Sequence, residues 1–69
     1  MTTNELITKA TGKTQLQVAR ALQLLSQIER DIMETRFCPT TLVETASRHG
    51  ITPMKVYEIE SHFYQLLND

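Results

Sequence analysis

Residues 41–67 read TLVETASRHGITPMKVYEIESHFYQLL, and this stretch decides the fold of the chain. It contains a small residue, a turn glycine, an apolar residue after the glycine and two branched apolar residues, at Ala46, Gly50, Ile51, Val56 and Ile59. A small residue lets a second helix cross the first closely, and glycine tolerates the positive φ of a sharp turn. The spacing therefore predicts two packed helices, over residues 41–49 and 52–67, joined by a short turn.

Hydroxyl residues mark the helix starts. A Ser or Thr followed three residues later by Glu or Gln can form a capping box, in which each side chain accepts a hydrogen bond from the other residue's backbone N–H. This spacing occurs at Thr2/Glu5, Thr14/Gln17, Ser26/Glu29 and Thr41/Glu44. A fifth start is indicated by Thr52, which is followed by Pro53, a residue suited to the first helical position.

Glycine and proline mark the helix ends. Gly12 and Gly50 suit a left-handed C-cap, and Pro39 disfavours a helical residue before it. Together with the apolar periodicity, these signals predict helices over residues 3–11, 14–25, 26–37, 41–49 and 52–67. A second interpretation stays open for the middle of the chain, where the helical spacing of apolar residues continues through Ser26 and permits one long helix over 14–36.

The expected fold class is all-α, because no stretch alternates apolar and polar residues in the manner of a strand. A chain of 69 residues suits one domain. We expect this domain over residues 1–69, with a tri-helical core over 25–67 and an N-terminal helical extension over 1–24. The N-terminal third is predicted to form either a flanking helical hairpin or a dimerisation surface, for which Leu16, Val18, Leu22 and Leu25 supply apolar area. On the last helix, the buried stripe is predicted at Val56, Ile59, Phe63 and Leu66.

Composition narrows the classes of function. The formal net charge is −1, whereas strong non-specific nucleic-acid binders are usually basic. Cys38 is the only cysteine, which excludes an intrachain disulfide and suits a reducing compartment, and we expect its side chain to be at least half-buried. Because the chain has neither a signal-peptide pattern nor an apolar run of about 18 residues, we expect a cytoplasmic protein without membrane contact.

Residues 25–67 resemble the fourth region of bacterial sigma factors. Residues 25–37 read LSQIERDIMETRF, close to that region's Leu-x-x-x-Glu-Arg-x-Val-Ile-x-x-Arg-Phe, and TLVETA at 41–46 and VYEIE at 56–60 continue the pattern. The same segment is similar to small plasmid and phage regulators of the helix-turn-helix superfamily. The resemblance implies a tri-helical helix-turn-helix core whose last helix enters the major groove of double-stranded DNA.

The resemblance and the side-chain chemistry together indicate seven DNA-binding candidates: Arg48, Thr52, Met54, Lys55, Tyr57, Glu58 and Ser61. Arg48 and Lys55 can hold phosphates, and Thr52 and Ser61 can reach phosphate or base edges. The chemistry of these four residues predicts contacts that position the protein on the DNA backbone more than contacts that read the bases.

Three further candidates can contact bases directly. Glu58 can accept a hydrogen bond from a cytosine amino group, and Met54 and Tyr57 can contact a thymine methyl group. Sigma factors usually carry arginines in the first turn of this helix, where the present chain has Pro53, Met54, Lys55 and Tyr57. The bidentate contact of arginine with guanine is therefore not expected from this helix.

Two functions follow from these observations. The first is a small DNA-binding transcriptional regulator that acts as a homodimer through its helix-turn-helix. The alternative is a degenerate helix-turn-helix that binds RNA polymerase or another regulatory protein without reading DNA. Lys55 is the only cation in the first turn of the predicted recognition helix, and this favours the alternative.

Other chemistry is not indicated. No arrangement of Ser, His and Asp or of Cys and His points to catalysis, so we expect neither an enzyme nor a cofactor. Cys38, His49 and His62 do not follow zinc-ligand spacing, so we expect no metal site. We expect His49 to cap carbonyls at a helix C-terminus, His62 to be solvated, and Glu60 to lie on a solvated helix face.

Overall fold

The computed structural model describes residues 2–38 and 40–68, which form five helices and no strand. The helices are α1 (Thr3–Thr11), α2 (Gln15–Gln23), α3 (Gln27–Phe37), α4 (Leu42–His49) and α5 (Pro53–Asn68). The expected all-α fold class is confirmed, and each helix begins and ends within two residues of its predicted bounds.

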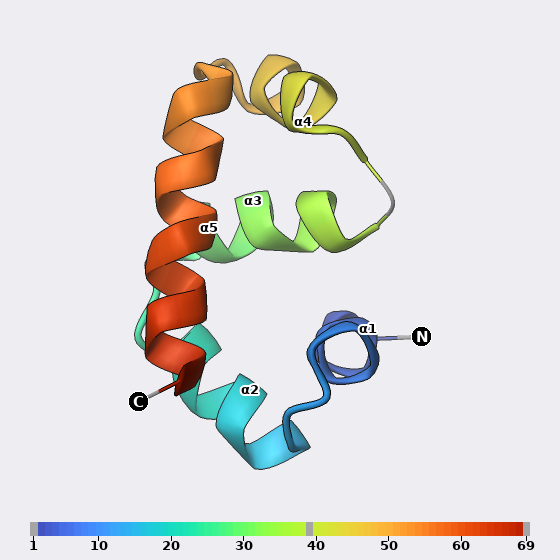
Figure 1. The fold of residues 1–69 in the computed structure, drawn as a ribbon. Coiled ribbons are helices and arrows are strands. Elements are labelled where there is room, and N and C mark those ends of the chain that lie inside the picture. Colours follow the sequence, from blue (N-terminus) through green and yellow to red (C-terminus); the bar gives the residue numbers. More distant parts are fainter. Residues whose placement is uncertain (1, 39, 69) are drawn as a thin grey trace.

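The longest helix, α5, runs along one side of the molecule and contacts three of the others (Figure 1). Along its length α5 packs first against α4, then against α3 and finally against α2. Because α3 and α4 also contact each other, α3, α4 and α5 form a three-helix group. Helix α1 packs on α2 and α3, so the two N-terminal helices extend this group around the second half of α5.

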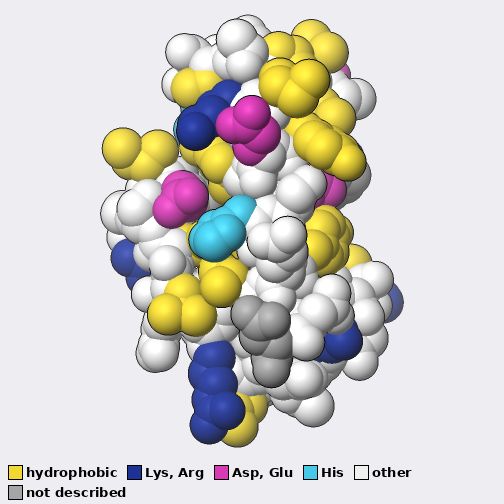
Figure 2. Space-filling model, turned by 60° about the vertical axis from the view of Figure 1, so that its left-hand side comes forward, with side chains coloured by type: hydrophobic (Ala, Val, Ile, Leu, Met, Phe, Trp, Pro, Cys, Tyr) yellow, Lys and Arg dark blue, Asp and Glu magenta, His cyan; other side chains and the backbone are white. Residues whose placement is uncertain are grey.

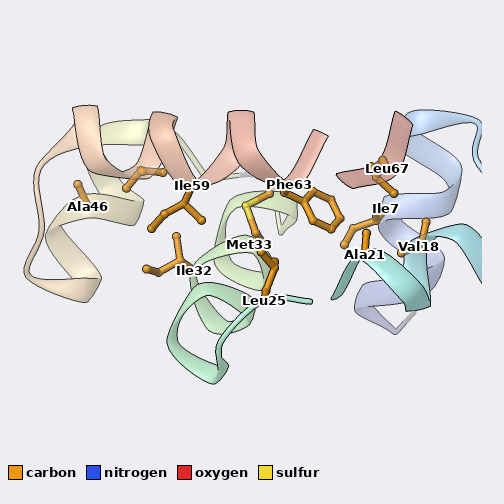
Figure 3. Close-up of a cluster of buried hydrophobic side chains, with 11 residues drawn as sticks. Ile7, Val18, Ala21, Leu25, Ile32, Met33, Ala46, Ile59, Phe63 and Leu67 are labelled. Atoms are coloured by element: carbon orange, nitrogen blue, oxygen red, sulfur yellow. The ribbon is translucent and has the colours of Figure 1, made fainter. Parts of the chain in front are cut away.

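All five helices contribute to one apolar core (Figure 3). Its buried side chains are Ile7, Val18, Ala21, Leu25, Ile32, Met33, Ala46, Val56, Ile59, Phe63 and Leu67. Phe63 is fully buried, and its ring meets the edge of Phe37 with the centroids 6.2 Å apart. Ile7 of α1 and Val18 and Ala21 of α2 are among the core residues, so both N-terminal helices contribute to the core.

The chain breaks between α2 and α3, so the alternative of one long helix over residues 14–36 is wrong. Ser26 caps α3 through a reciprocal pair of bonds: its N–H donates to Glu29 Oε1 at 3.0 Å, and the Glu29 N–H donates to Ser26 Oγ at 3.2 Å. The break turns Leu25 into the core and leaves Leu24 and Ile28 exposed. The hydrogen bonds of the Ser26 cap and the burial of Leu25 therefore favour two helices, although the apolar spacing continues through Ser26.

The other predicted caps form as well. Thr14 and Gln17 make a complete capping box. The Thr2 side chain accepts a hydrogen bond from the Glu5 N–H, and the Thr41 side chain accepts one from the Glu44 N–H. Gly12 and Gly50 adopt the predicted left-handed conformation, with φ of 75° and 66°. Helix α3 ends at Phe37. The predicted cause of this helix end, Pro39, lies outside the described residues. Met1 and Asp69 also lie outside them.

Three predictions about side-chain burial need correction. Cys38 is exposed, because it follows α3 in an extended conformation in which its thiol does not reach the core. On α5 the buried leucine is Leu67, and Leu66 is only partly buried at the edge of the core. Of the four residues predicted to form a dimer surface, Val18 and Leu25 are buried in the chain's own core and Leu22 packs against it, which leaves only Leu16 exposed, at 61%.

Candidate functional site

Helices α4 and α5, with the turn between them, form the α4–α5 unit (residues 42–68). The Ile51 N–H donates to the carbonyl of Ala46 at 3.0 Å and closes the turn beyond Gly50. The Thr52 hydroxyl then accepts from the N–H of Lys55 at 3.1 Å and caps α5. These local bonds set the direction in which α5 leaves the turn and place its first two turns at the surface.

The structure brings most of the DNA-binding candidates to this surface. Arg48, Thr52, Met54, Lys55, Tyr57 and Glu58 are exposed, and Ser61 is half-buried. Because residues three and four apart lie on the same side of a helix, Met54, Tyr57, Glu58 and Ser61 form one outward stripe on α5. The opposite side of the helix carries Val56 and Ile59, which are buried in the core. The buried residues therefore orient the candidates towards solvent.

The charges on this surface are of mixed sign. Nζ of Lys55 lies 3.8 Å from Oε2 of Glu58, one turn later on α5. The pKa of the Glu29 carboxyl, at the start of α3, is lowered mainly by the Ser26 N–H that donates to it. The charges of His62 and Lys55 lower this pKa slightly further. Figure 2 looks onto the α5 side, and the Lys and Arg side chains visible there lie apart instead of forming one patch.

An apolar groove lies where the starts of α4 and α5 meet. Leu42, Pro53, Met54 and Tyr57 line this α4–α5 groove, which encloses about 370 Å³. Val43, the residue after Leu42, lines a separate hollow that shares Leu42 with the groove. Val43, Met54 and Tyr57 are exposed apolar side chains, at 67%, 66% and 57%. In Figure 2 hydrophobic side chains gather near the top, at the height of α4 and the start of α5.

Met54 and Tyr57 are predicted site residues, whereas the groove that they form with Leu42 and Pro53 was not predicted from the sequence. The adjacent apolar residues Leu42 and Val43 could have indicated an exposed apolar side chain at the start of α4. Successive residues on a helix point about 100° apart, so both cannot face the core from the first turn of α4. Leu42 packs partly against the core, and Val43 is left in solvent.

Two side-chain contacts between helices were also not predicted. His49 does not cap carbonyls of α4, because its Nε2 lies 2.9 Å from Oγ1 of Thr35 on α3. Glu60 does not lie on a solvated face, because its carboxylate pairs with Arg36 on α3 at 3.2 Å. Both corrections have the same physical reason: α3 packs against α4 and α5, which places polar partners from distant parts of the chain side by side.

His62 is exposed, as expected. Within residues 2–38 and 40–68, no three His, Cys, Asp or Glu side chains come together as metal ligands would. Among the same residues, no helix has the length and apolar character needed to cross a membrane. No protein-family model, curated protein or solved structure matches the chain. The functional inference therefore depends on the surface of the α4–α5 unit.

Proposed function

We propose that the chain is a small transcriptional regulator of the helix-turn-helix superfamily and that it binds double-stranded DNA by placing residues 52–61 in the major groove. One observation carries the proposal: four of the five candidates on α5 share one outward stripe, while Val56 and Ile59 anchor the opposite side of the helix in the core. A recognition helix needs this arrangement, because its base-contacting side chains must be free to enter the major groove.

Each candidate then has a role. Arg48 and Lys55 hold phosphates, and the Ser61 hydroxyl reaches a phosphate or a base edge. The Thr52 oxygen accepts the capping bond of α5, and its hydroxyl proton remains available for a phosphate oxygen. Met54 and Tyr57 contact thymine methyl groups, and Glu58 accepts from a cytosine amino group.

The small number of cations sets the expected affinity. With two phosphate contacts per protomer, the logarithm of the binding constant should fall with the logarithm of salt concentration at a slope of about −2 per protomer. Base readout without arginine contributes less discrimination than a bidentate contact with guanine. The proposal therefore predicts modest affinity and depends on two subunits binding together.

The test is fluorescence anisotropy with random-sequence duplex DNA at about 50 mM and about 200 mM salt. Arg48→Ala and Lys55→Ala should each weaken binding and reduce the salt slope by about one. Lys9→Ala and Arg20→Ala are matched controls, because both side chains are exposed on other helices and their loss changes the net charge equally. Absence of binding at low salt, or equal losses in all four variants, would contradict the proposal.

A second candidate function is a protein-interaction module that binds RNA polymerase or another regulatory protein without reading DNA. Two observations favour it: the apolar α4–α5 groove, and the pairing of Lys55 with Glu58. A groove lined by exposed apolar side chains suits a protein partner better than a phosphate backbone.

Val43 separates the two candidates, because it is an exposed apolar residue in a hollow that shares Leu42 with the groove, and it is not a DNA-binding candidate. If the chain binds DNA, Glu58→Gln should tighten binding by freeing Lys55, and Val43→Thr should change nothing. If it binds a protein there, Val43→Thr should weaken its binding to purified bacterial RNA polymerase, measured by biolayer interferometry, and Lys55→Ala should not.

A further inference from the structure

The exposed side of α2 takes no part in the proposed DNA contact. Helix α2 packs against the last part of α5, at the opposite end of the molecule from α4 and the start of α5 (Figure 1). Leu16, Arg20 and Leu24 are four residues apart and share one side of α2, because the C-cap Leu24 keeps helical backbone angles. All three are exposed, the leucines at 61% and 68%, whereas Val18 and Ala21 on the other side are buried in the core. We define the α2 face by its exposed residues Leu16, Gln17, Arg20, Gln23 and Leu24.

The charge of this region is opposite to that of the rest of the chain. Between Glu5 and Glu29 the sequence carries Lys9, Lys13 and Arg20 and no acidic residue, which gives a charge of +3. The remaining residues carry four cations and eight acidic side chains, a charge of −4, which accounts for the net charge of −1. Arg20 is the only charged residue of α2, and it lies between the two leucines of the α2 face. A partner of complementary charge is therefore acidic.

A small hollow beside Arg20 has the polarity that such a partner needs. Gln17 and Arg20 line it from α2, Leu66 and Leu67 line it from the end of α5, and it encloses about 150 Å³. The planar guanidinium of an arginine binds a carboxylate through two parallel N–H donors, and a glutamine amide adds a further donor. Leu66 is only partly buried and offers an apolar wall for the methylene groups of the same side chain. The hollow therefore suits a glutamate side chain of a partner.

We propose that the α2 face binds an acidic amphipathic helix of another protein, with a carboxylate at Arg20 and apolar side chains on Leu16 and Leu24. The two leucines are eight residues apart on α2, which is roughly 12 Å at the rise of a helix. Apolar residues seven or eight positions apart on a partner helix lying along α2 match this distance. The arrangement also agrees with the composition of protein interfaces, in which arginine is enriched.

Two other kinds of macromolecule fit the α2 face less well. A DNA backbone would pair with the cations but would leave both leucines without an apolar partner. An anionic lipid surface requires a continuous apolar side on the helix with the cations on the other side, whereas on α2 the arginine stands between the leucines. A helical protein segment matches both features, because it can carry carboxylates and apolar side chains on one face.

The test begins with a display selection of random peptides of about 15 residues on the immobilised full chain, in which we expect two apolar residues seven or eight positions apart with Asp or Glu between them. Isothermal titration calorimetry then compares one enriched peptide on the wild type and on variants. Arg20→Glu should weaken binding at least about tenfold, and Leu16→Ser and Leu24→Ser about fivefold each. Arg48→Glu and Val43→Ser are matched controls that should bind like the wild type, because both side chains are exposed on α4.

A charge exchange gives the decisive result. Replacing the acidic residue of the peptide with lysine should abolish binding to the wild type and restore binding to the Arg20→Glu variant. Absence of enrichment, enriched peptides without acidic residues, or a failed exchange would overturn the proposal. It would also be overturned if the wild type bound phosphatidylglycerol vesicles or random duplex DNA through this face, so that Arg20→Glu and Leu24→Ser abolished that binding and the two α4 controls did not.

The inference stands apart from the proposed function. The selection contains no DNA, so a chain that binds the acidic peptides but no DNA refutes only the proposed function. A chain whose DNA binding depends on Arg48 and Lys55, but which enriches no acidic peptide, refutes only the role of the α2 face.

Discussion

The guanidinium of Arg36 on α3 lies 3.2 Å from the carboxylate of Glu60 on α5, measured from Nε to Oε2. Its Nη1 also donates to the carbonyl of Thr40 at 2.6 Å. The two paired side chains are only 31% and 19% exposed, so solvent screens their attraction less than it would at a fully exposed site. One arginine therefore ties α3 to the segment before α4 and to the middle of α5, and helps to hold the α4–α5 unit in place.

This contact should matter for stability more than the exposed pair of Lys55 and Glu58. Arg36→Met should lower the free energy of unfolding by about 2 kcal/mol, because it removes two charge-assisted hydrogen bonds. Lys55→Met, the control, should cost less than about 0.5 kcal/mol. Urea denaturation measures both, and equal losses would show that the arginine does not connect the helices energetically.

The contact between Thr35 and His49 predicts a tautomer. The Thr35 hydroxyl donates to the carbonyl of Asp31 at 3.0 Å, so its oxygen accepts from Nε2–H of His49. The neutral imidazole should therefore carry its proton on Nε2, which NMR of the imidazole nitrogens reports directly. Thr35→Val should cost about 1 kcal/mol and Thr35→Ser much less. A neutral ring protonated on Nδ1 would contradict this assignment.

The two glycine caps should respond alike to substitution. Both have positive φ, and a Cβ built on either one meets no atom within 4 Å. The cost of Gly12→Ala and Gly50→Ala is thus conformational and should be about 1 kcal/mol each in thermal or urea unfolding. Gly50→Asn should be milder, because Asn adopts the left-handed region more readily. A much larger loss at Gly50 would indicate a steric cost that the turn does not show.

Glu29 should make the stability of the protein depend on pH. Its pKa is lowered from 4.5 in the folded chain, chiefly by the N–H of Ser26, so the unfolded chain takes up this proton more readily. The stabilisation is complete above about pH 4.5 and is lost as the pH falls through the lowered pKa. Glu29→Gln, which keeps the capping oxygen, should be less stable than the wild type at pH 7 by about 0.5 kcal/mol, and the difference should vanish in acid. A constant difference across the acid range would disprove the linkage.

Two methionines should behave in opposite ways. Met33 is fully buried, and Met33→Ala should cost about 2–5 kcal/mol through the cavity that it leaves. Met54 is 66% exposed, and Met54→Ala should change stability by less than about 0.5 kcal/mol. Denaturation curves of both variants check this, and a large loss for Met54→Ala would mean that it has a structural role instead of being free for a partner.

The sequence by itself determined the local structure of this protein. The starts at Thr2, Thr14, Ser26, Thr41 and Thr52 each form, because a cap depends only on residues up to three positions away. The stops at Gly12 and Gly50 form because glycine adopts positive φ without steric cost. The outward stripe on α5 was equally predictable, since it is the complement of the apolar periodicity that buries Val56 and Ile59.

Only the tertiary structure decided which apolar residues are exposed and which polar residues meet. The apolar spacing did not distinguish Leu25, which is buried, from Ile28, which is exposed, because the difference arises from the break before α3. The partners of His49 and Glu60 lie 14 and 24 residues away, on a helix whose packing brings them together. Local patterns depend on near neighbours in the chain, whereas these contacts depend on how the five helices share one core.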